Sequence, residues 1–222
     1  MASRGKETFS QSTQWPKVVL FGDSITQLSF SNDGCWGSML ADLLQRKCDV
    51  INRGYSGYNA RWCVKMISKV FEEFASRDVA MVTIFLGAND SNLPANSHQH
   101  VPAEEYKTHL INMVEKLQML GIPREKIILV TPPACDVIAW EADCVVNGRQ
   151  CQKCNKAAGQ YANLCKEASI EAGTGCIDLY TEMMKVKDWE KLLKDGLHLS
   201  TKGSALLFQL LKPFVLKVTS GI

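Results

Sequence analysis

The chain has 222 residues, of which 46% are hydrophobic and 22% charged, and its formal net charge is +2 at pH 7. This near balance of acidic and basic side chains does not indicate the strongly basic surface that would bind nucleic acid or an anionic membrane. No apolar run reaches the ~20 residues that a membrane-spanning helix needs. We therefore expect a globular protein with no nucleic-acid partner and no stable membrane insertion, active as a monomer or homodimer.

The amino-terminal segment is polar and lacks the apolar core of a secretory signal, which favours a cytoplasmic location. We expect residues 1–15 to be a disordered lead-in and residues 16–218 to form a single domain of ordinary size.

Nine cysteines, an odd number, are scattered along the chain. In a reducing compartment most such residues are small buried hydrophobes. Cys151 and Cys154 have a spacing that occurs in zinc sites, and Cys144 is close in sequence. A structural zinc site usually needs four ligands, and no second pair is near. We expect free thiols and no metal, with zinc as the less favoured alternative.

Short apolar runs alternate with segments of helical periodicity. Strands are expected at residues 17–21, 49–51, 79–86, 126–130 and 176–179. Helices are expected over residues 36–44, 63–74, 102–120 and 156–172 and after Ser200, where Pro213 could bend or end the last one. This alternation predicts an α/β fold: a three-layer α/β/α doubly wound domain with a five-stranded parallel sheet.

Residues 134–154 show no clear period and are expected to be a long irregular stretch. A loop of this length is uncommon in a compact domain, so it could be a lid or pocket wall. The alternative is a tolerated surface insertion.

Polar, glycine-rich segments follow the strands of the predicted sheet. They are residues 22–24, 52–57, 87–90 and 131–133, and a further one, residues 195–198, precedes the last helix. Ligands of doubly wound sheets bind beyond the carboxyl ends of the strands. We therefore expect these segments to meet at one edge of the sheet.

The residue types in these segments match nucleophilic catalysis. A serine hydroxyl such as that of Ser24 is a weak nucleophile until a neighbouring base takes its proton. His198 is the expected base, and Asp195 is close enough to orient it. The oxyanion that forms on attack needs fixed N–H donors, which Gly57 and Asn89 are available to supply.

In these segments the chain resembles the SGNH (GDSL) hydrolases. Four blocks of that family occur in order over about residues 16–216: Gly22-Asp23-Ser24-Ile25, Asn52 to Gly57, Gly87-Ala88-Asn89-Asp90 and Asp195-Gly196-Leu197-His198. Ile25 stands where the family name has Leu. The resemblance implies a flavodoxin-like fold, a catalytic triad of Ser24, Asp195 and His198, and an oxyanion hole formed by Ser24, Gly57 and Asn89. Gly54 is a less favoured alternative to Gly57.

The resemblance narrows to the isoamyl acetate-hydrolysing esterase branch, in its animal form, through residues 53–62, 85–90 and 195–200. It implies a serine esterase that acts on small carboxylic esters, or on lipid esters in lipid metabolism, without metal or organic cofactor. Lysophospholipase, thioesterase and alcohol acyltransferase activities at the same site remain alternatives. An inactive binding module is disfavoured because no member of the catalytic set is missing.

Several other polar and aromatic side chains are given structural roles. We expect Asp23 to hydrogen-bond the turn beside the nucleophile and Asp90 to cap a helix or turn. Trp62 is placed in the core, whereas Trp140 and Trp189 are left between core and pocket lining. The remaining histidines have no comparable partners and are expected to be structural or exposed: His98, His100 and His109.

Overall fold

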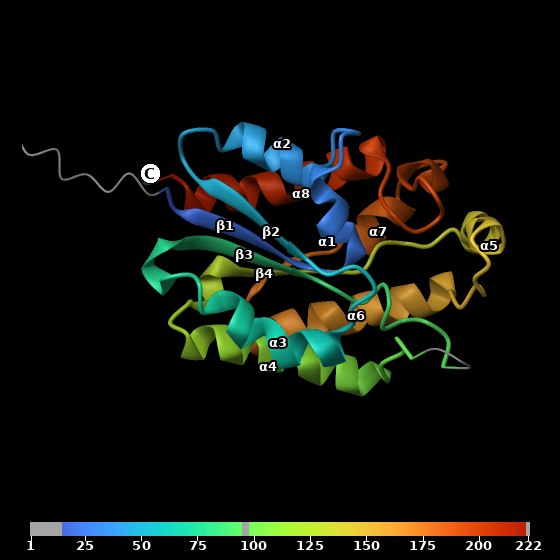
Figure 1. The fold of residues 1–222 in the computed structure, drawn as a ribbon, viewed down its shortest axis with the longest axis horizontal. Coiled ribbons are helices and arrows are strands. Elements are labelled where there is room, and N and C mark those ends of the chain that lie inside the picture. The colour runs from blue at the N-terminus through green and yellow to red at the C-terminus, as the bar shows by residue number, and fades with distance from the viewer. Residues whose placement is uncertain (1–14, 95–97, 221–222) are drawn as a thin grey trace, which may run out of the picture.

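The computed structural model describes residues 15–94 and 98–220 (Figure 1). Apart from residue 15, the expected disordered lead-in lies outside the described residues. Five strands form one parallel sheet in the order β2-β1-β3-β4-β5, with all pairings parallel. Their bounds are β1 Lys17–Gly22, β2 Asp49–Gly54, β3 Val79–Phe85, β4 Ile127–Val130 and β5 Gly175–Ile177. The prediction of a five-stranded parallel sheet is confirmed.

Helices cover both faces of the sheet (Figure 1). The α-helices are α1 Ser24–Gln27, α2 Trp36–Leu43, α3 Ala60–Phe71, α4 Ala103–Met119, α5 Val137–Val146, α6 Asn155–Ala172, α7 Leu179–Met184 and α8 Thr201–Val218. Helices α2 and α8 pack on one face, and α3, α4 and α6 pack on the other. Short 3₁₀ turns occur at Leu28–Phe30, Ser76–Asp78, Arg124–Lys126 and Trp189–Leu192.

The central strands are apolar on both sides because each face is covered by a helical layer. In β1, Val18 and Leu20 pack in one core cluster, and Val19 and Phe21 pack in the other. Every residue of β3 is buried. The expected three-layer architecture follows from this double burial.

The last helix begins as predicted, because the Ser200 hydroxyl accepts the Gly203 amide 3.3 Å away. It continues through Pro213 to Val218 rather than ending there. Within the described part of the chain, we find no helix with the length and apolar character needed to span a bilayer.

The expectation of an irregular stretch over residues 134–154 was wrong, because α5 forms within it. Asp136 caps this helix by accepting the Ile138 and Ala139 amides. Trp140 and Cys144 are buried on its inner side, but apolar side chains also lie outside: Ile138, Val145 and Val146 are 83%, 73% and 85% exposed. Apolar residues on both sides of a helix obscure the hydrophobic period that identifies one.

Candidate active site

Ser24 is the first residue of α1, directly after β1, and is 9% exposed. Asp23 caps α1 through Oδ1, which accepts the Ile25 amide 2.9 Å away. Gly22 allows the ends of β1 and β3 to approach closely, since a Cβ there would lie 2.4 Å from the Phe85 carbonyl oxygen. The sharp exit from the strand thus presents the serine at the carboxyl edge of the sheet, and Asp23 has the structural role expected from the sequence.

His198 and Asp195 lie in the loop before α8 and reach Ser24 from the far end of the sequence. His198 Nε2 is 2.9 Å from Ser24 Oγ, and His198 Nδ1 is 2.6 Å from Asp195 Oδ2. Asp195 Oδ1 accepts the backbone amides of Leu197 and His198 at 2.9 and 2.7 Å. The three predicted catalytic side chains therefore form one continuous hydrogen-bonded series.

The carboxylate of Asp195 is held in its charged form. Burial alone would raise its pKa, but the hydrogen bond and charge of His198 and the two backbone amides outweigh that effect and lower the pKa. A charged Asp195 can accept the Nδ1–H of His198, which leaves Nε2 unprotonated and directed at Ser24.

Helix α5 packs directly against the loop that carries His198. The Asp136 amide donates to the Gly196 carbonyl at 2.9 Å. Gly196 has a φ of +91°, and a Cβ there would lie 2.4 Å from the Trp140 nitrogen, so only glycine fits. The Trp140 ring meets the His198 ring edge-on at a centroid distance of 5.8 Å. The stretch 134–154 is therefore a wall of the site, which was one of the two possibilities left by the sequence.

The two further predicted donors face the same space. Gly57 has a φ of +80°, and its carbonyl accepts Gln99 Nε2 at 2.8 Å. One hydrogen of the Asn89 amide is used by the Tyr58 carbonyl, 2.8 Å from Nδ2. Gly54 instead packs under α1, where a Cβ would lie 2.0 Å from the Gln27 nitrogen. The geometry thus favours Gly57 over Gly54 as a cavity residue.

A cavity of about 170 Å³ joins these groups. Ser24, Gly57, Asn89 and His198 line it, with Asp195 behind the histidine. The other lining residues were not assigned individual roles from the sequence; they are Ser56, Asn92, Gln99, Trp140, Cys144, Arg149, Gln150, Gln152, Lys153 and Leu197. Trp140 was left open as a lining candidate. Ser56 and Leu197 belong to the segments 52–57 and 195–198 singled out in the sequence, whereas the other residues come from segments without a recognisable motif and reach the site only through the fold.

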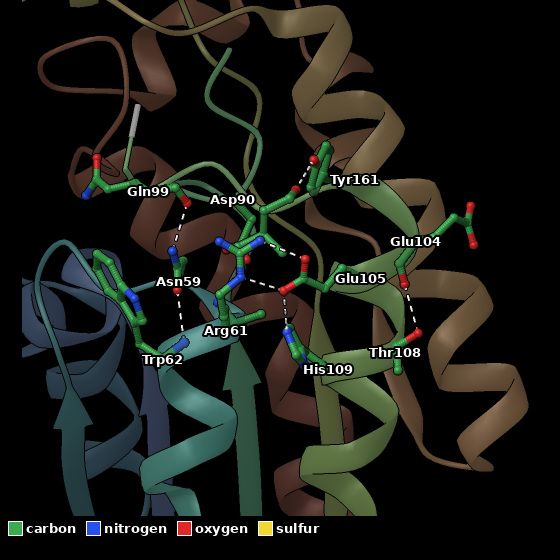
Figure 2. Close-up of polar contacts among 12 residues, drawn as sticks. Asn59, Arg61, Trp62, Asp90, Gln99, Glu104, Glu105, Thr108, His109 and Tyr161 are labelled. Atoms are coloured by element: carbon green, nitrogen blue, oxygen red, sulfur yellow. Dashed lines mark hydrogen bonds and ion pairs between the residues drawn. The ribbon is translucent and has the colours of Figure 1, made fainter. Parts of the chain in front are cut away.

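A polar network behind the cavity fixes the start of α3 (Figure 2). Asn59 accepts the Trp62 amide and donates to the Gln99 carbonyl, so it joins α3 to the segment that precedes α4. Asp90 accepts the Ala60 amide at 2.8 Å, which is the capping role expected for it. These bonds hold the Gly57 segment beside the turn that carries Asn89.

Beside this network, Arg61 and Glu105 point toward each other between α3 and α4 (Figure 2). The guanidinium makes a two-pronged ion pair at 2.5 and 2.7 Å. The hydrogen bonds and charge of Arg61, aided by His109, lower the pKa of Glu105 to about 2, although burial acts in the opposite direction. His109 Nε2 lies 2.9 Å from the same carboxylate, so the expectation that His109 has no such partner was wrong. Because Arg61 already occupies Glu105, this pair is structural.

The other aromatic and histidine assignments are also resolved. His98 stacks on Trp62 at a centroid distance of 5.9 Å, and His100 Nδ1 lies 2.7 Å from the Asn92 carbonyl oxygen. Trp62 is only partly buried and contacts Tyr58 edge-on, so its expected place in the core was wrong. Helical periodicity identifies the apolar stripe of α3 but does not distinguish the side chains at its margin, where Trp62 lies.

All nine cysteines are free thiols, and Cys144 lines the cavity. Among the residues that the structure describes, no group of three or more His, Cys, Asp or Glu side chains is arranged to hold a metal ion.

Three buried ionisable groups surround the nucleophile and the turn that follows β3. Burial raises the pKa of Asp23 to about 6 and that of Asp90 to about 7. Burial also lowers the pKa of Lys153 to about 8, although the two carboxylates act in the opposite direction. The site therefore contains two acids and one base whose charged forms are costly unless they stabilise one another.

Comparisons with known proteins agree with this architecture. Residues 20–206 match the GDSL-like Lipase/Acylhydrolase family. The isoamyl acetate-hydrolyzing esterase 1 homolog of Homo sapiens is 46% identical over 211 residues, which cover 94% of this chain and 84% of that protein. A GDSL esterase/lipase of Arabidopsis thaliana is 43% identical, with 87% and 83% covered.

Solved structures show the same fold. The lipase/acylhydrolase from Enterococcus faecalis has a TM-score of 0.67 at 27% identity and covers 92% of this chain and 96% of its own. An acetylxylan esterase from Geobacillus stearothermophilus has a TM-score of 0.67 at 23% identity, with 91% and 94% covered. At 23% identity, the likeness to the acetylxylan esterase concerns the fold alone.

Proposed function

The chain belongs to the GDSL-like lipase/acylhydrolase family and is a carboxylic ester hydrolase, and from that premise we propose that it cleaves short-chain esters through an acyl-enzyme on Ser24. The observation that carries this proposal is the hydrogen-bonded series from Ser24 Oγ to His198 and Asp195, with distances of 2.9 and 2.6 Å.

In the first half of the reaction, Ser24 Oγ attacks the ester carbonyl carbon while His198 Nε2 takes the hydroxyl proton. Asp195 stabilises the imidazolium that forms. Collapse of the tetrahedral intermediate breaks the bond to the alcohol oxygen, and His198 returns its proton to that leaving alcohol. In the second half, water replaces the serine hydroxyl as nucleophile, and the carboxylic acid leaves with Ser24 restored.

The negative charge on the carbonyl oxygen needs donors that are fixed before the reaction. We assign the backbone amides of Ser24 and Gly57 and the side chain of Asn89 to this task. The bond from Asn89 to the Tyr58 carbonyl supports the assignment, because it fixes one hydrogen of the amide and leaves the other for the cavity.

The size of the cavity supports small substrates. About 170 Å³ is close to the ~150 Å³ that holds a benzene molecule in an engineered protein cavity, and it is smaller than the ~300 Å³ or more of drug-sized sites. Short acyl groups such as acetate fit such a space. The same volume disfavours the long acyl chains of lysophospholipids and of long-chain thioesters, so we place lipid esters second.

All proposed catalytic groups come from one chain within a single hydrolytic domain, which we assign to residues 16–218. The proposed chemistry uses no organic cofactor or metal, and its partner is a small-molecule ester. The nine free thiols are compatible with a reducing compartment, which supports a cytoplasmic location.

The proposal is tested by hydrolysis of p-nitrophenyl esters from acetate to octanoate. Wild type should prefer acetate or butyrate, and Ser24→Ala should reduce hydrolysis to background at every chain length without loss of the far-UV circular dichroism spectrum. Ser169→Ala is the matched control, since this buried serine lies on α6 and its hydroxyl donates to the Lys166 carbonyl. A Ser24→Ala variant that retains activity contradicts the mechanism, and a preference for octanoate contradicts the substrate class.

A further inference from the structure

Lys153 is a buried lysine in the wall of the cavity. It lies between α5 and α6, is 7% exposed and lines the same space as Ser24 and Asn89. Lysine is almost never fully buried without a partner, because removing its charge from water is costly. The proposed mechanism assigns no task to this side chain, so its burial needs another explanation.

The ammonium group holds the turn that carries Asn89. Lys153 Nζ donates to the Ala88 carbonyl at 2.5 Å, across 65 positions of sequence. The same carbonyl accepts the Ser91 hydroxyl at 3.2 Å, and the Ser91 amide closes the turn on the Gly87 carbonyl at 3.0 Å. Because Ala88 directly precedes Asn89, this bond restrains the backbone from which the amide reaches the cavity.

The positive charge of Lys153 is also balanced by the negative charges of two buried carboxylates, those of Asp23 and Asp90. Asp23 and Asp90 each use Oδ1 to cap a helix. Their Oδ2 atoms are buried and accept no hydrogen bond from the described part of the chain. Both residues are sequence neighbours of proposed catalytic groups, Ser24 and Asn89. Uncompensated negative charge there would oppose the negative charge that develops on the substrate carbonyl.

From this geometry we propose that Lys153 is a positioning residue of the oxyanion hole. Its hydrogen bond to Ala88 fixes the direction of the Asn89 amide, and its positive charge offsets Asp23 and Asp90 beside the developing oxyanion. The inference rests on the proposed function, because it assumes that Asn89 donates to the oxyanion.

The test is a double-mutant cycle between Lys153→Met and Asn89→Ala, with p-nitrophenyl acetate as substrate. Lys153→Met keeps the unbranched side chain as far as Cε and removes both the donor and the charge. It should lower kcat by roughly 10- to 100-fold, a part of the cost of one oxyanion donor, with KM changed by less than about threefold. In the Asn89→Ala background the same change should lower kcat by a smaller factor than in wild type, because the donor that Lys153 positions is already absent and only the loss of its charge remains.

Lys126→Met is the matched control. Its Nζ also donates to a backbone carbonyl, that of Val79 at 2.6 Å, but at the opposite end of β3, and its loss should leave kcat unchanged. If Lys153→Met does not fold, as judged by circular dichroism and thermal melting, Lys153→Gln takes its place in the same cycle. Glutamine is one atom shorter than lysine and carries no charge, so a kcat loss of at least threefold that is smaller in the Asn89→Ala background is expected.

Independent, multiplicative losses from the two substitutions would overturn the proposal, and so would a rise in KM with unchanged kcat. A folded Lys153 variant with wild-type kcat would overturn it as well. These outcomes differ from failure of the proposed function, which would appear as retained activity in Ser24→Ala or Asn89→Ala alone.

Discussion

Replacing Asp195 with asparagine changes one atom of the proposed triad, and the contacts of that residue predict the consequence. Oδ1 accepts two backbone amides, from Leu197 and His198, and Oδ2 accepts Nδ1–H of His198. An asparagine has only one acceptor oxygen, so it cannot satisfy both sides.

If the oxygen of the new side chain keeps the two backbone amides, its NH₂ group faces His198 Nδ1. The neutral ring must then accept at Nδ1 and carry its proton on Nε2, where it can no longer take the proton of Ser24. If the amide is reversed, its NH₂ group meets two N–H donors that lie 2.7 and 2.9 Å from the present oxygen. The first orientation therefore removes the functional base, and the second leaves the backbone N–H donors of Leu197 and His198 unpaired.

We therefore expect Asp195→Asn to lower kcat by up to about 10⁴-fold, as the wrong tautomer does in a serine protease, which corresponds to ~5.4 kcal/mol of barrier. Steady-state hydrolysis of p-nitrophenyl acetate measures this loss. Asp178→Asn is the control: that carboxylate also accepts a backbone amide, from Thr181, and pairs with Lys166, but it lies outside the cavity. An Asp195→Asn variant that folds and keeps more than about a tenth of wild-type kcat refutes the reasoning.

Three other substitutions test separate parts of the site. Asn89→Ala should lower kcat by roughly 10²- to 10³-fold with a smaller change in KM, and the reverse pattern would make it a ground-state binding residue. Trp140→Ala should enlarge the cavity and raise kcat/KM for hexanoate relative to acetate by roughly tenfold, the value of about two buried methylenes; an unchanged ratio would place the acyl group elsewhere. Burial raises the pKa of Asp90 from 3.8 to about 7, so the folded state holds this proton more tightly than the unfolded state and loses up to about 4 kcal/mol of stability as pH rises between those values. Urea unfolding at pH 4 and pH 8 should show that Asp90→Asn lacks this loss of stability; an equal loss in both proteins would contradict it.

Much of the fold could be predicted because its signals are local. The β3 strand is an uninterrupted apolar run, and Ser200 and Pro102 stand at the starts of α8 and α4. Parallel topology then follows from the alternation of strands and helices. Helix α5 was missed since its apolar residues lie on both sides, and only packing against the loop at Gly196 shows which side is inner.

The residues of the candidate site also divide into those that the sequence signals and those that only the folded chain reveals. Ser24, Asn89 and His198 occupy short motifs whose residue types carry recognisable chemistry, and strand topology brings such motifs to one edge. Lys153 has no sequence signal, because an isolated lysine in a polar segment reads as an exposed one. Its importance depends on burial against Ala88, a contact that spans 65 positions and exists only in the folded chain.

The proposed mechanism depends most directly on Ser24 as the nucleophile. Reaction with a fluorophosphonate probe, followed by peptide mass spectrometry, identifies the side chain that forms the covalent adduct. We predict one adduct on Ser24 in wild type, slow labelling in His198→Ala and no labelling in Ser24→Ala. An adduct on another residue, such as the cavity thiol Cys144, or labelling that persists in Ser24→Ala, would contradict the proposed mechanism.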